Sequence, residues 1–250
     1  MYASWHDERL IKLAKTFWPG PLTLLLPKKN IVPNIVTSGL DYVAVRVPAH
    51  PLTLELLKQL NFPLAAPSAN PFGYVSPTEA AHVNKQLGDK ITYILDGGAC
   101  SVGIESTIVG IEEGVVCIYR LGGLSLEEIE KIIGTVELRI NISSDPKAPG
   151  QLKSHYAPKK PVVIGNLEEL IKTHQNKKIG IICFGEEKFT GANLTVFNLS
   201  KERSLSEAAI NLFKYLRLAD ESDVEILICE KLPEEGLGRA INDRLRRAAG

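Results

Sequence analysis

Short apolar runs alternate with longer amphipathic segments along the chain, and this alternation is typical of an α/β protein. In the first half, strands are predicted at residues 22–26, 42–47, 63–66, 91–95, 107–111 and 115–119. The last two runs flank a Glu-Glu-Gly turn at 112–114, which predicts a β-hairpin. Capping boxes predict helix starts at Ser76 and Ser125, and Gly134 is a predicted helix stop.

The hydrophobic periodicity of the sequence changes after residue 140. Residues 141–150 lack periodicity and are rich in loop-forming residues, so we predict a linker at 141–160 between domains at 1–140 and 161–250. In the C-terminal domain, strands are predicted at 162–164, 178–184, 194–199 and 224–229, with helices at 167–173, 204–218 and 237–248. Strands separated by helices favour a small parallel sheet with crossover helices.

Composition and charge narrow the class of protein. Hydrophobic residues make up 44% of the 250 residues and charged residues 23%, as in a soluble globular protein. Lys+Arg and Asp+Glu are both 29, so a strongly basic nucleic-acid-binding surface is not expected. Apolar runs are too short for a bilayer, and the N-terminus lacks a signal-peptide pattern, so we expect no membrane contact and a cytoplasmic location. The four cysteines form no metal or disulfide pattern, and we expect buried thiols.

The most informative polar segment is Pro-Leu-Ala-Ala-Pro-Ser-Ala-Asn at 63–70, where a predicted strand passes into a loop. Ligands bind beyond strand ends in open α/β sheets, and Ser68 and Asn70 would share one side of an extended backbone. The alternative, which spacing alone favours, is a turn in which both side chains bond their own backbone. Ser76 is explained by its predicted capping role, although a helix N-terminus also attracts phosphate.

Two arginines and a serine are further candidates. Arg46 alternates with the valines of its strand and suits a carboxylate or phosphate, or else lies on a solvated face. Arg120, at the end of the hairpin, offers the same two interpretations. Ser106 has no His or Asp at a spacing that would make it a nucleophile. His50 is interpreted as a cap or surface residue.

The linker and the last helix leave alternatives open. Tyr156 could cover a crevice of the first domain or simply pack between domains. The last helix is rich in arginine, at positions 239, 244, 246 and 247. These cations could meet RNA, but the more common role is to complement the helix dipole on a solvated face.

Six motifs in order carry a resemblance: 17–23 Phe-Trp-Pro-Gly-Pro-Leu-Thr, 43–48 Val-Ala-Val-Arg-Val-Pro, 66–70 Ala-Pro-Ser-Ala-Asn, 76–78 Ser-Pro-Thr, 96–98 Asp-Gly-Gly and 103–109 Gly-Ile-Glu-Ser-Thr-Ile-Val. Together with His-Tyr-Ala-Pro at 155–158 and Gly-Leu-Gly-Arg-Ala at 236–240, they resemble the two-domain threonylcarbamoyl-AMP synthases of the YrdC-like family. The resemblance implies a twisted mixed sheet with helices, followed by a small Rossmann-like parallel α/β domain. The Pro-Thr-Glu-Thr-like strand and Lys-x-Arg motif that open the family's first domain do not occur here, which implies an N-terminally incomplete domain.

The family's reaction combines L-threonine, bicarbonate and ATP, with magnesium, into threonylcarbamoyl-AMP and pyrophosphate. A separate transferase then uses the product to modify an adenosine beside the tRNA anticodon. No protein nucleophile is needed, in agreement with the absence of a recognisable one. Carried over by motif, the threonine-binding residues are Arg46, Ala66 and Ser106, and the ATP-binding residues are Tyr42, Ser68, Asn70, Ser76, Arg120 and Tyr156.

Three other functions remain as alternatives at this point. One is a non-catalytic RNA-binding module of the same fold, with weak contact to tRNA, which the zero net charge argues against. Another is an inactive fragment of the synthase. The third is a carbamoyl-phosphate-using relative from hydrogenase maturation, whose zinc-finger-like cysteine motifs are not found here.

Overall fold

The structure is a computed structural model that describes residues 2–140 and 156–250. Contacts divide the chain into two compact units. The first unit comprises Met1–Pro67 and Glu105–Leu152, and the second comprises Ser68–Ile104 and Lys153–Gly250. The linker predicted at 141–160 lies outside the described residues except for 156–160. The division into domains at 1–140 and 161–250 stays a prediction.

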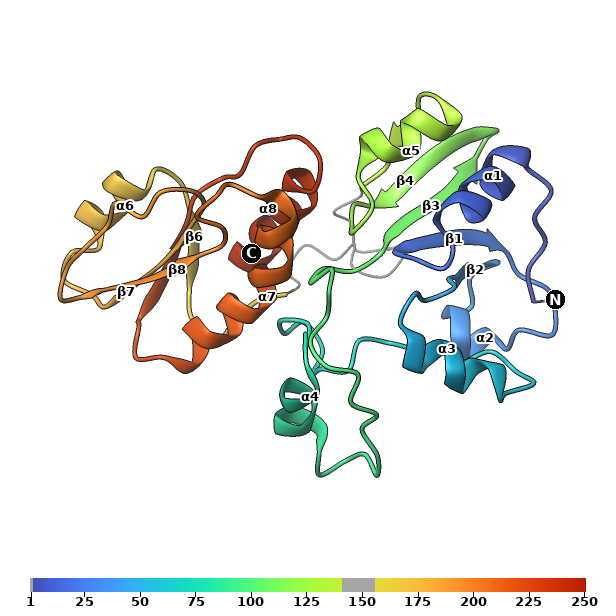
Figure 1. The fold of residues 1–250 in the computed structure, drawn as a ribbon, viewed down its shortest axis with the longest axis horizontal. Coiled ribbons are helices and arrows are strands. Elements are labelled where there is room, and N and C mark those ends of the chain that lie inside the picture. Colours follow the sequence, from blue (N-terminus) through green and yellow to red (C-terminus); the bar gives the residue numbers. More distant parts are fainter. Residues whose placement is uncertain (1, 141–155) are drawn as a thin grey trace. The chain divides into compact units, whose positions relative to one another are not determined.

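The first unit is built on a five-stranded mixed sheet of order β2-β1-β3-β4-β5 (Figure 1). Its strands are β1 (Leu22–Pro27), β2 (Tyr42–Val45), β3 (Thr107–Glu112), β4 (Val115–Arg120) and β5 (Glu137–Leu138). β1 pairs with β3 and β4 with β5 in parallel, whereas the β1–β2 and β3–β4 pairs are antiparallel. The expected mixed sheet is therefore confirmed.

Local turn chemistry explains the hairpin between β3 and β4. Glu113 and Gly114 have φ angles of 52° and 79°, the left-handed conformation that a tight type I′ hairpin turn requires at both central positions. Glycine adopts this conformation without steric cost, and the predicted turn is confirmed.

Helices α1 (Glu8–Phe17), α2 (Asn34–Thr37), α3 (Pro51–Lys58) and α5 (Leu126–Ile133) complete the first unit. The α5 helix begins at the predicted capping box, in which the Ser125 hydroxyl and the Glu128 carboxylate each accept the other's backbone N–H, and it ends at Gly134. The apolar faces of α1 and α5 bury Leu10, Leu13 and Ile129.

Two predicted strands and one predicted helix start are wrong. Residues 63–66 and 91–95 form no β-ladder, and Leu64 and Leu95 remain 47% and 61% exposed. Prolines at 63 and 67 remove backbone donors that a ladder would need. Helix α4 (Ala80–Leu87) begins after Glu79 rather than at Ser76, because the backbone carbonyl of Ser76 is engaged elsewhere, by Arg217.

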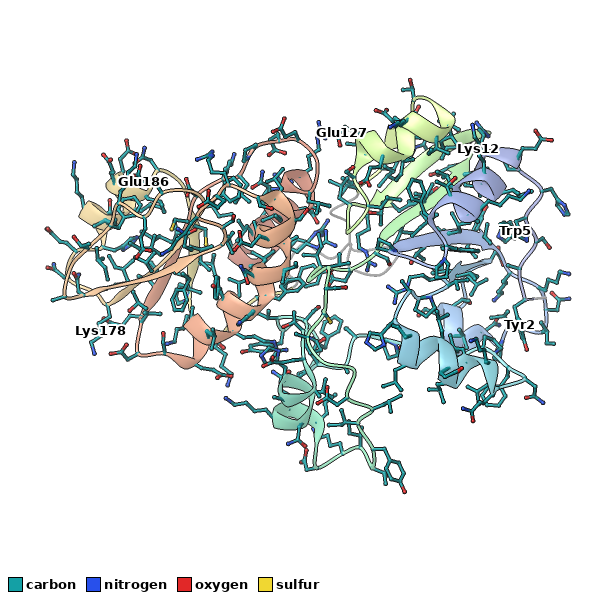
Figure 2. All side chains as sticks on the ribbon, viewed as in Figure 1. Tyr2, Trp5, Lys12, Glu127, Lys178 and Glu186 are labelled. Atoms are coloured by element: carbon teal, nitrogen blue, oxygen red, sulfur yellow. The ribbon has the colours of Figure 1, made fainter. Side chains whose placement is uncertain are left out.

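The second unit is built on a parallel sheet of order β6-β9-β7-β8, which confirms the predicted Rossmann-like arrangement. Its strands are β6 (Val162–Ile164), β7 (Ile179–Cys183), β8 (Leu194–Asn198) and β9 (Ile226–Cys229). Helix α6 (Leu167–Thr173) follows β6, α7 (Leu205–Glu221) follows β8 and α8 (Gly238–Ala249) follows β9, whereas β7 and β8 are joined without a helix. Apolar side chains of β7 and β9 form the core, whereas charged residues such as Lys178 and Glu186 point outward (Figure 2).

The arginines of α8 correct an expectation. Arg244 and Arg247 are 0% and 2% exposed, so they do not line a solvated face. Their guanidinium nitrogens lie 3.3 and 3.0 Å from the Asp243 carboxylate, which supplies a charge partner inside the unit. Arg246 is exposed, as expected.

All four cysteines are thiols, and Cys117, Cys183 and Cys229 are buried as expected, whereas Cys100 is exposed. Burial raises the pKa of the Cys183 thiol to about 11. Among the residues that the structure describes, no helix combines the length and the apolar character needed to cross a membrane.

Candidate active site

Strand register brings three predicted site residues to one end of the sheet in the first unit. β1 and β3 run in parallel and start together, because Leu22 pairs with Thr107. The antiparallel strands β2 and β4 end there, with Val45 beside Leu24 and Arg120 beside Ile108. Arg46, Ser106 and Arg120 therefore gather where β1 and β3 begin.

A hydrogen-bond network fixes Ser106 at this sheet end. The hydroxyl oxygens of Thr23 and Ser106 are 2.7 Å apart, and both side chains are buried. Arg120 donates from Nη2 to the Ser106 Oγ at 3.1 Å, and from Nε and Nη2 to its carbonyl at 3.1 and 2.9 Å. The Ser106 hydroxyl is thus held between a second hydroxyl and a guanidinium, an arrangement suited to binding an oxygen-rich anion.

Close backbone packing explains why this network forms. A Cβ atom on Gly122 would lie 2.3 Å from the Glu105 carbonyl oxygen and 2.4 Å from the Ser106 carbonyl carbon, so only glycine fits. The Thr107 hydroxyl donates to the Leu124 carbonyl at 2.5 Å and accepts from the Leu124 N–H at 3.1 Å. These contacts lock the segment that carries Ser106 against the end of β4.

The other predicted site residues of the first unit are Arg46, Tyr42 and Ala66. Arg46 directly follows β2. The residue after it, Val47, accepts a hydrogen bond at its carbonyl from the N–H of Gly20 at 2.9 Å. Tyr42 opens β2 beside Pro27 and lies at the opposite end of that strand from Arg46. Ala66 is exposed in an irregular segment.

Ser68 and Asn70 belong to the second unit. Ser68 is exposed, and its carbonyl accepts the Asn70 N–H at 3.0 Å. The Asn70 amide donates from Nδ2 to the carbonyls of Pro71 and Tyr74 at 2.8 and 3.1 Å. For Asn70, this is the turn that spacing alone favours. Its Oδ1 is buried without a hydrogen-bond partner among the described residues, which leaves an acceptor for a donor from a ligand.

Ser76 and Tyr156 are both buried in the second unit. Ser76 does not cap a helix, and its carbonyl accepts from Nε of Arg217 at 3.1 Å. The Tyr156 ring lies 5.3 Å from the Phe213 ring and 5.4 Å from the Arg244 guanidinium carbon. Tyr156 is only 1% exposed, so packing against α7 and α8 accounts for its position. Its backbone φ is 63°, in the left-handed region.

Sequence reasoning missed Thr23, Thr107 and Arg217. Thr23 is part of the 17–23 motif, but its contact with Ser106 spans 83 positions and has no local signature. Arg217 carries a readable signal, because it falls four residues after Phe213 on the apolar face of α7. A cation at such a position must find acceptors inside the protein.

The donor set at the sheet end favours anions over a resident metal. Within residues 2–140 and 156–250, no group of three or more His, Cys, Asp or Glu side chains could hold a metal ion. Hydroxyls and guanidiniums suit carboxylates and phosphates, and Mg²⁺ bound to ATP is commonly held by the phosphates and water.

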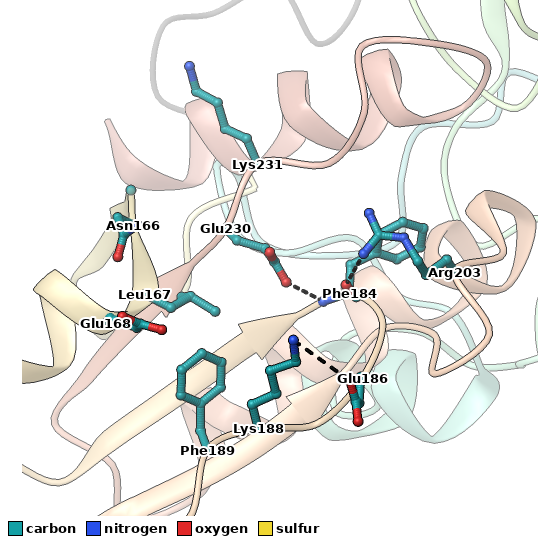
Figure 3. Close-up of a pocket in the computed structure, with 11 residues that line it drawn as sticks. Asn166, Leu167, Glu168, Phe184, Glu186, Lys188, Phe189, Arg203, Glu230 and Lys231 are labelled. Atoms are coloured by element: carbon teal, nitrogen blue, oxygen red, sulfur yellow. Dashed lines mark hydrogen bonds and ion pairs between the residues drawn. The ribbon is translucent and has the colours of Figure 1, made fainter.

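A separate cavity of about 570 Å³ lies at the carboxyl ends of β6, β7 and β9 (Figure 3). Its wall includes carboxylates of Glu168, Glu186 and Glu230 and cations of Lys188, Arg203 and Lys231. None of the predicted site residues lines it, and its opposite charges balance.

Two family models together match nearly the whole chain. The Sua5/YciO/YrdC model, described as "Telomere recombination", matches residues 1–122, and the model described as "Threonylcarbamoyl-AMP synthase, C-terminal domain" matches residues 124–250. The chain is 44% identical to the threonylcarbamoyl-AMP synthase of Pyrococcus abyssi, covering 97% of this chain and 74% of that protein. It is 37% identical to that of Bacillus subtilis, covering 97% and 73%.

A solved structure agrees with these matches. The structure of P. abyssi Sua5 complexed with L-threonine superposes with a TM-score of 0.91 at 42% identity, covering all of this chain and 76% of the other. The chain belongs to the Sua5/YciO/YrdC family. The second model covers the C-terminal half of the chain. The chain therefore falls in the two-domain branch of the family, whose curated members are named threonylcarbamoyl-AMP synthase.

Proposed function

We propose that this protein is a threonylcarbamoyl-AMP synthase, a nucleotidyltransferase that converts L-threonine, bicarbonate and ATP into threonylcarbamoyl-AMP and pyrophosphate. The high identity to synthases over most of the chain supports this function. The observation that carries it is the Thr23–Ser106–Arg120 network, an anion-binding arrangement at the same end of the sheet as Arg46.

The reaction needs positioning rather than a protein nucleophile. The threonine amine first adds to bicarbonate with loss of water, which gives a carbamate. A carbamate oxygen then attacks the α-phosphorus of ATP, and the bond from that phosphorus to pyrophosphate breaks. The protein lowers the barrier by orienting the carbamate and by stabilising charge on the phosphates.

In the first unit, we assign the threonine carboxylate to Arg46, whose planar guanidinium donates to both carboxylate oxygens. The Ser106 hydroxyl and the backbone at Ala66 would contact the rest of the amino acid. Because Thr23 and Arg120 hold Ser106, its hydroxyl needs little reorganisation on binding.

We assign ATP contacts to Arg120, Ser68, Asn70 and Ser76, the residues that the family's motifs imply. The buried, unpartnered Oδ1 of Asn70 is an acceptor for a ligand donor. Tyr42, at the end of β2 opposite Arg46, and Tyr156, buried against α7, are proposed as nucleotide contacts from the family's motifs. Magnesium would accompany the phosphates.

The product is a mixed anhydride between a carbamate and a phosphate, so it is an activated acyl donor. We propose that a separate transferase moves its threonylcarbamoyl group to adenosine in tRNA, releasing AMP. This division of labour agrees with a site that holds small anions.

The test is pyrophosphate release from ATP, measured with both co-substrates and with each omitted. We expect release only when threonine and bicarbonate are both present. Arg46→Ala should raise KM for threonine by roughly tenfold or more, and KM for ATP much less, because one charge-assisted contact is removed.

Arg139→Ala is the matched control, because the Arg139 side chain pairs with Glu112 and Glu137 and not with the Thr23–Ser106–Arg120 network, so its removal should leave both KM values unchanged. Release that ignores threonine would contradict the proposed function. An equal rise of both KM values in Arg46→Ala would assign Arg46 a folding role instead.

A further inference from the structure

Helix α7 reaches the irregular segment 70–78 through a buried arginine. Arg217 is 2% exposed, and its Nε donates to the Ser76 carbonyl at 3.1 Å. Its Nη2 donates to the Val75 carbonyl and, at 3.1 Å, to Oε1 of Gln86. The guanidinium carbon also lies 5.1 Å from the centre of the Tyr74 ring. One side chain thus contacts three consecutive residues of the segment.

A carboxylate on the same face of α7 adds a second attachment. The Tyr74 hydroxyl donates to Oδ2 of Asp220 at 2.7 Å. Oδ1 of Asp220 accepts the backbone N–H groups of Lys159 and Lys160 at 2.8 and 3.1 Å. Burial and this carboxylate raise the pKa of Tyr74, so its hydroxyl keeps its proton.

The two attached segments are also bonded to each other. The N–H of Ala157 donates to the Gly73 carbonyl at 2.9 Å, and Tyr156 packs on Phe213 of α7. Segment 70–78 and segment 156–160 are therefore tied to α7 and to one another.

Segment 70–78 depends on these attachments for its order. It contains no helix or strand, so regular backbone hydrogen bonding does not fix its conformation. Acceptors at Val75 and Ser76 and the ring and hydroxyl of Tyr74 are instead used by side chains of α7. Burial disfavours the charged form of Arg217 and lowers its pKa. The buried guanidinium is therefore stabilised by these acceptors, just as the segment is stabilised by the donor.

We propose that Arg217 and Asp220 are positioning residues for nucleotide binding: they hold segment 70–78 in the conformation in which Asn70 and Ser76 meet ATP. This inference rests on the proposed function, because it takes the ATP contacts from it. It makes helix α7 of the second unit part of the machinery that binds ATP, although neither side chain is assigned a contact with substrate.

The test compares Arg217→Lys with a matched arginine of the same unit. Lysine keeps the charge but loses the planar fork that serves Val75, Ser76 and Gln86 together. We expect KM for ATP to rise roughly tenfold, with KM for threonine changed less than about twofold. Arg203→Lys is the control, because Arg203 stacks on Phe184 and donates to its carbonyl at 3.4 Å, outside segment 70–78.

A purely structural role would give a different result, in which the melting temperature falls and both KM values move equally or not at all. That result would overturn the proposal. If Arg217→Lys does not fold, Tyr74→Phe and Asp220→Asn replace it, since each alters one hydrogen bond of the same attachment. We expect each to raise KM for ATP and their effects to be non-additive.

Failure of the proposed function is distinguished by hydrogen exchange on the full chain. In the wild type, amides of 70–78 should be protected, and Arg217→Lys should raise their exchange at least roughly tenfold while Arg203→Lys does not. Unchanged exchange would overturn the attachment even if the chain proves to be an active synthase. Raised exchange in a chain that releases no pyrophosphate would reject the synthase and with it the assignment to ATP.

Discussion

At the scale of single residues, the proposed site relies on hydroxyls and guanidiniums. Thr23, Ser106 and Arg120 form one network, and none of these side-chain types changes its charge near neutral pH. A site of this kind stabilises anionic substrates without proton transfer by the protein. Any titration that affects folding near neutral pH must therefore arise elsewhere in the chain.

His82 is such a group, and it predicts a pH dependence of stability. Its Nδ1 accepts the Thr78 N–H at 3.2 Å, and burial, followed by the charge of Arg217, lowers its pKa. The unfolded chain therefore gains the His82 proton before the folded protein does. The stability contribution is fully present above the unfolded pKa of about 6.5 and is lost as pH falls through the lower folded value.

The measurement is urea unfolding between about pH 5 and 8, comparing the wild type with His82→Asn. Asparagine offers an acceptor oxygen near the position of Nδ1 but does not titrate, so its stability should fall less steeply below about pH 6.5. Parallel curves for the two proteins would reject the role of His82.

The sequence identified site residues where a motif carried them, and missed those that depend on packing. Arg46, Ser106 and Arg120 come together at one sheet end as strand register requires. Arg217 was missed because its acceptors lie 131 to 142 positions away. The capping interpretation of Ser76 failed for the same reason, since a distant arginine holds its carbonyl.

At the scale of elements, the sequence correctly predicted features that depend on neighbouring residues, such as a helix cap and a tight turn. The capping box at Ser125, the turn at 112–114 and the alternation of the C-terminal strands and helices are all confirmed. Residues 63–66 and 91–95 are predicted as strands on the same apolar pattern as the confirmed strands. A strand forms, however, only where another strand pairs with it. Apolar pattern alone does not identify that neighbour.

The packing of Gly122 predicts a coupling between a loop and the site. Gly122→Ala would place a methyl group within 2.5 Å of backbone atoms of Glu105, Ser106 and Thr107, which cannot move without shifting the start of β3. We expect a loss of about 1–3 kcal/mol in the free energy of unfolding. We also expect a higher KM for threonine, because Ser106 is displaced.

Urea unfolding and steady-state kinetics check this prediction. Gly165→Ala is the control, since its methyl group would meet only Leu170 at an ordinary 3.4 Å. A stable Gly122→Ala protein with unchanged kinetics would show that the segment carrying Ser106 tolerates displacement.

At the scale of the whole molecule, sequence families and packing divide the chain differently. Residues 68–104 fall within the first family model, yet their contacts place them in the second unit with the C-terminal residues. The proposed ATP contacts Ser68, Asn70 and Ser76 are in this segment. The C-terminal residues therefore contact a segment that the first family model covers, and this contact is the basis of the positioning role proposed for Arg217.

Charge at this scale bears on the alternative of an RNA-binding module. The net charge is zero, and Arg244 and Arg247 are buried beside Asp243 instead of facing solvent. On α8, only Arg239 and Arg246 are then left to displace counterions from a phosphate backbone. We predict weak tRNA binding, with an affinity that changes little with salt.

Filter binding of tRNA between about 50 and 200 mM salt measures this directly. A slope of log K against log salt shallower than about −2 is expected, against roughly −5 or steeper for a protein that neutralises many phosphates. Arg246→Ala removes an exposed cation of α8 and should leave the affinity unchanged. A steep slope that Arg246→Ala reduces would mean that α8 engages RNA, and the chain would then bind the nucleic acid itself rather than only supply its activated threonylcarbamoyl group.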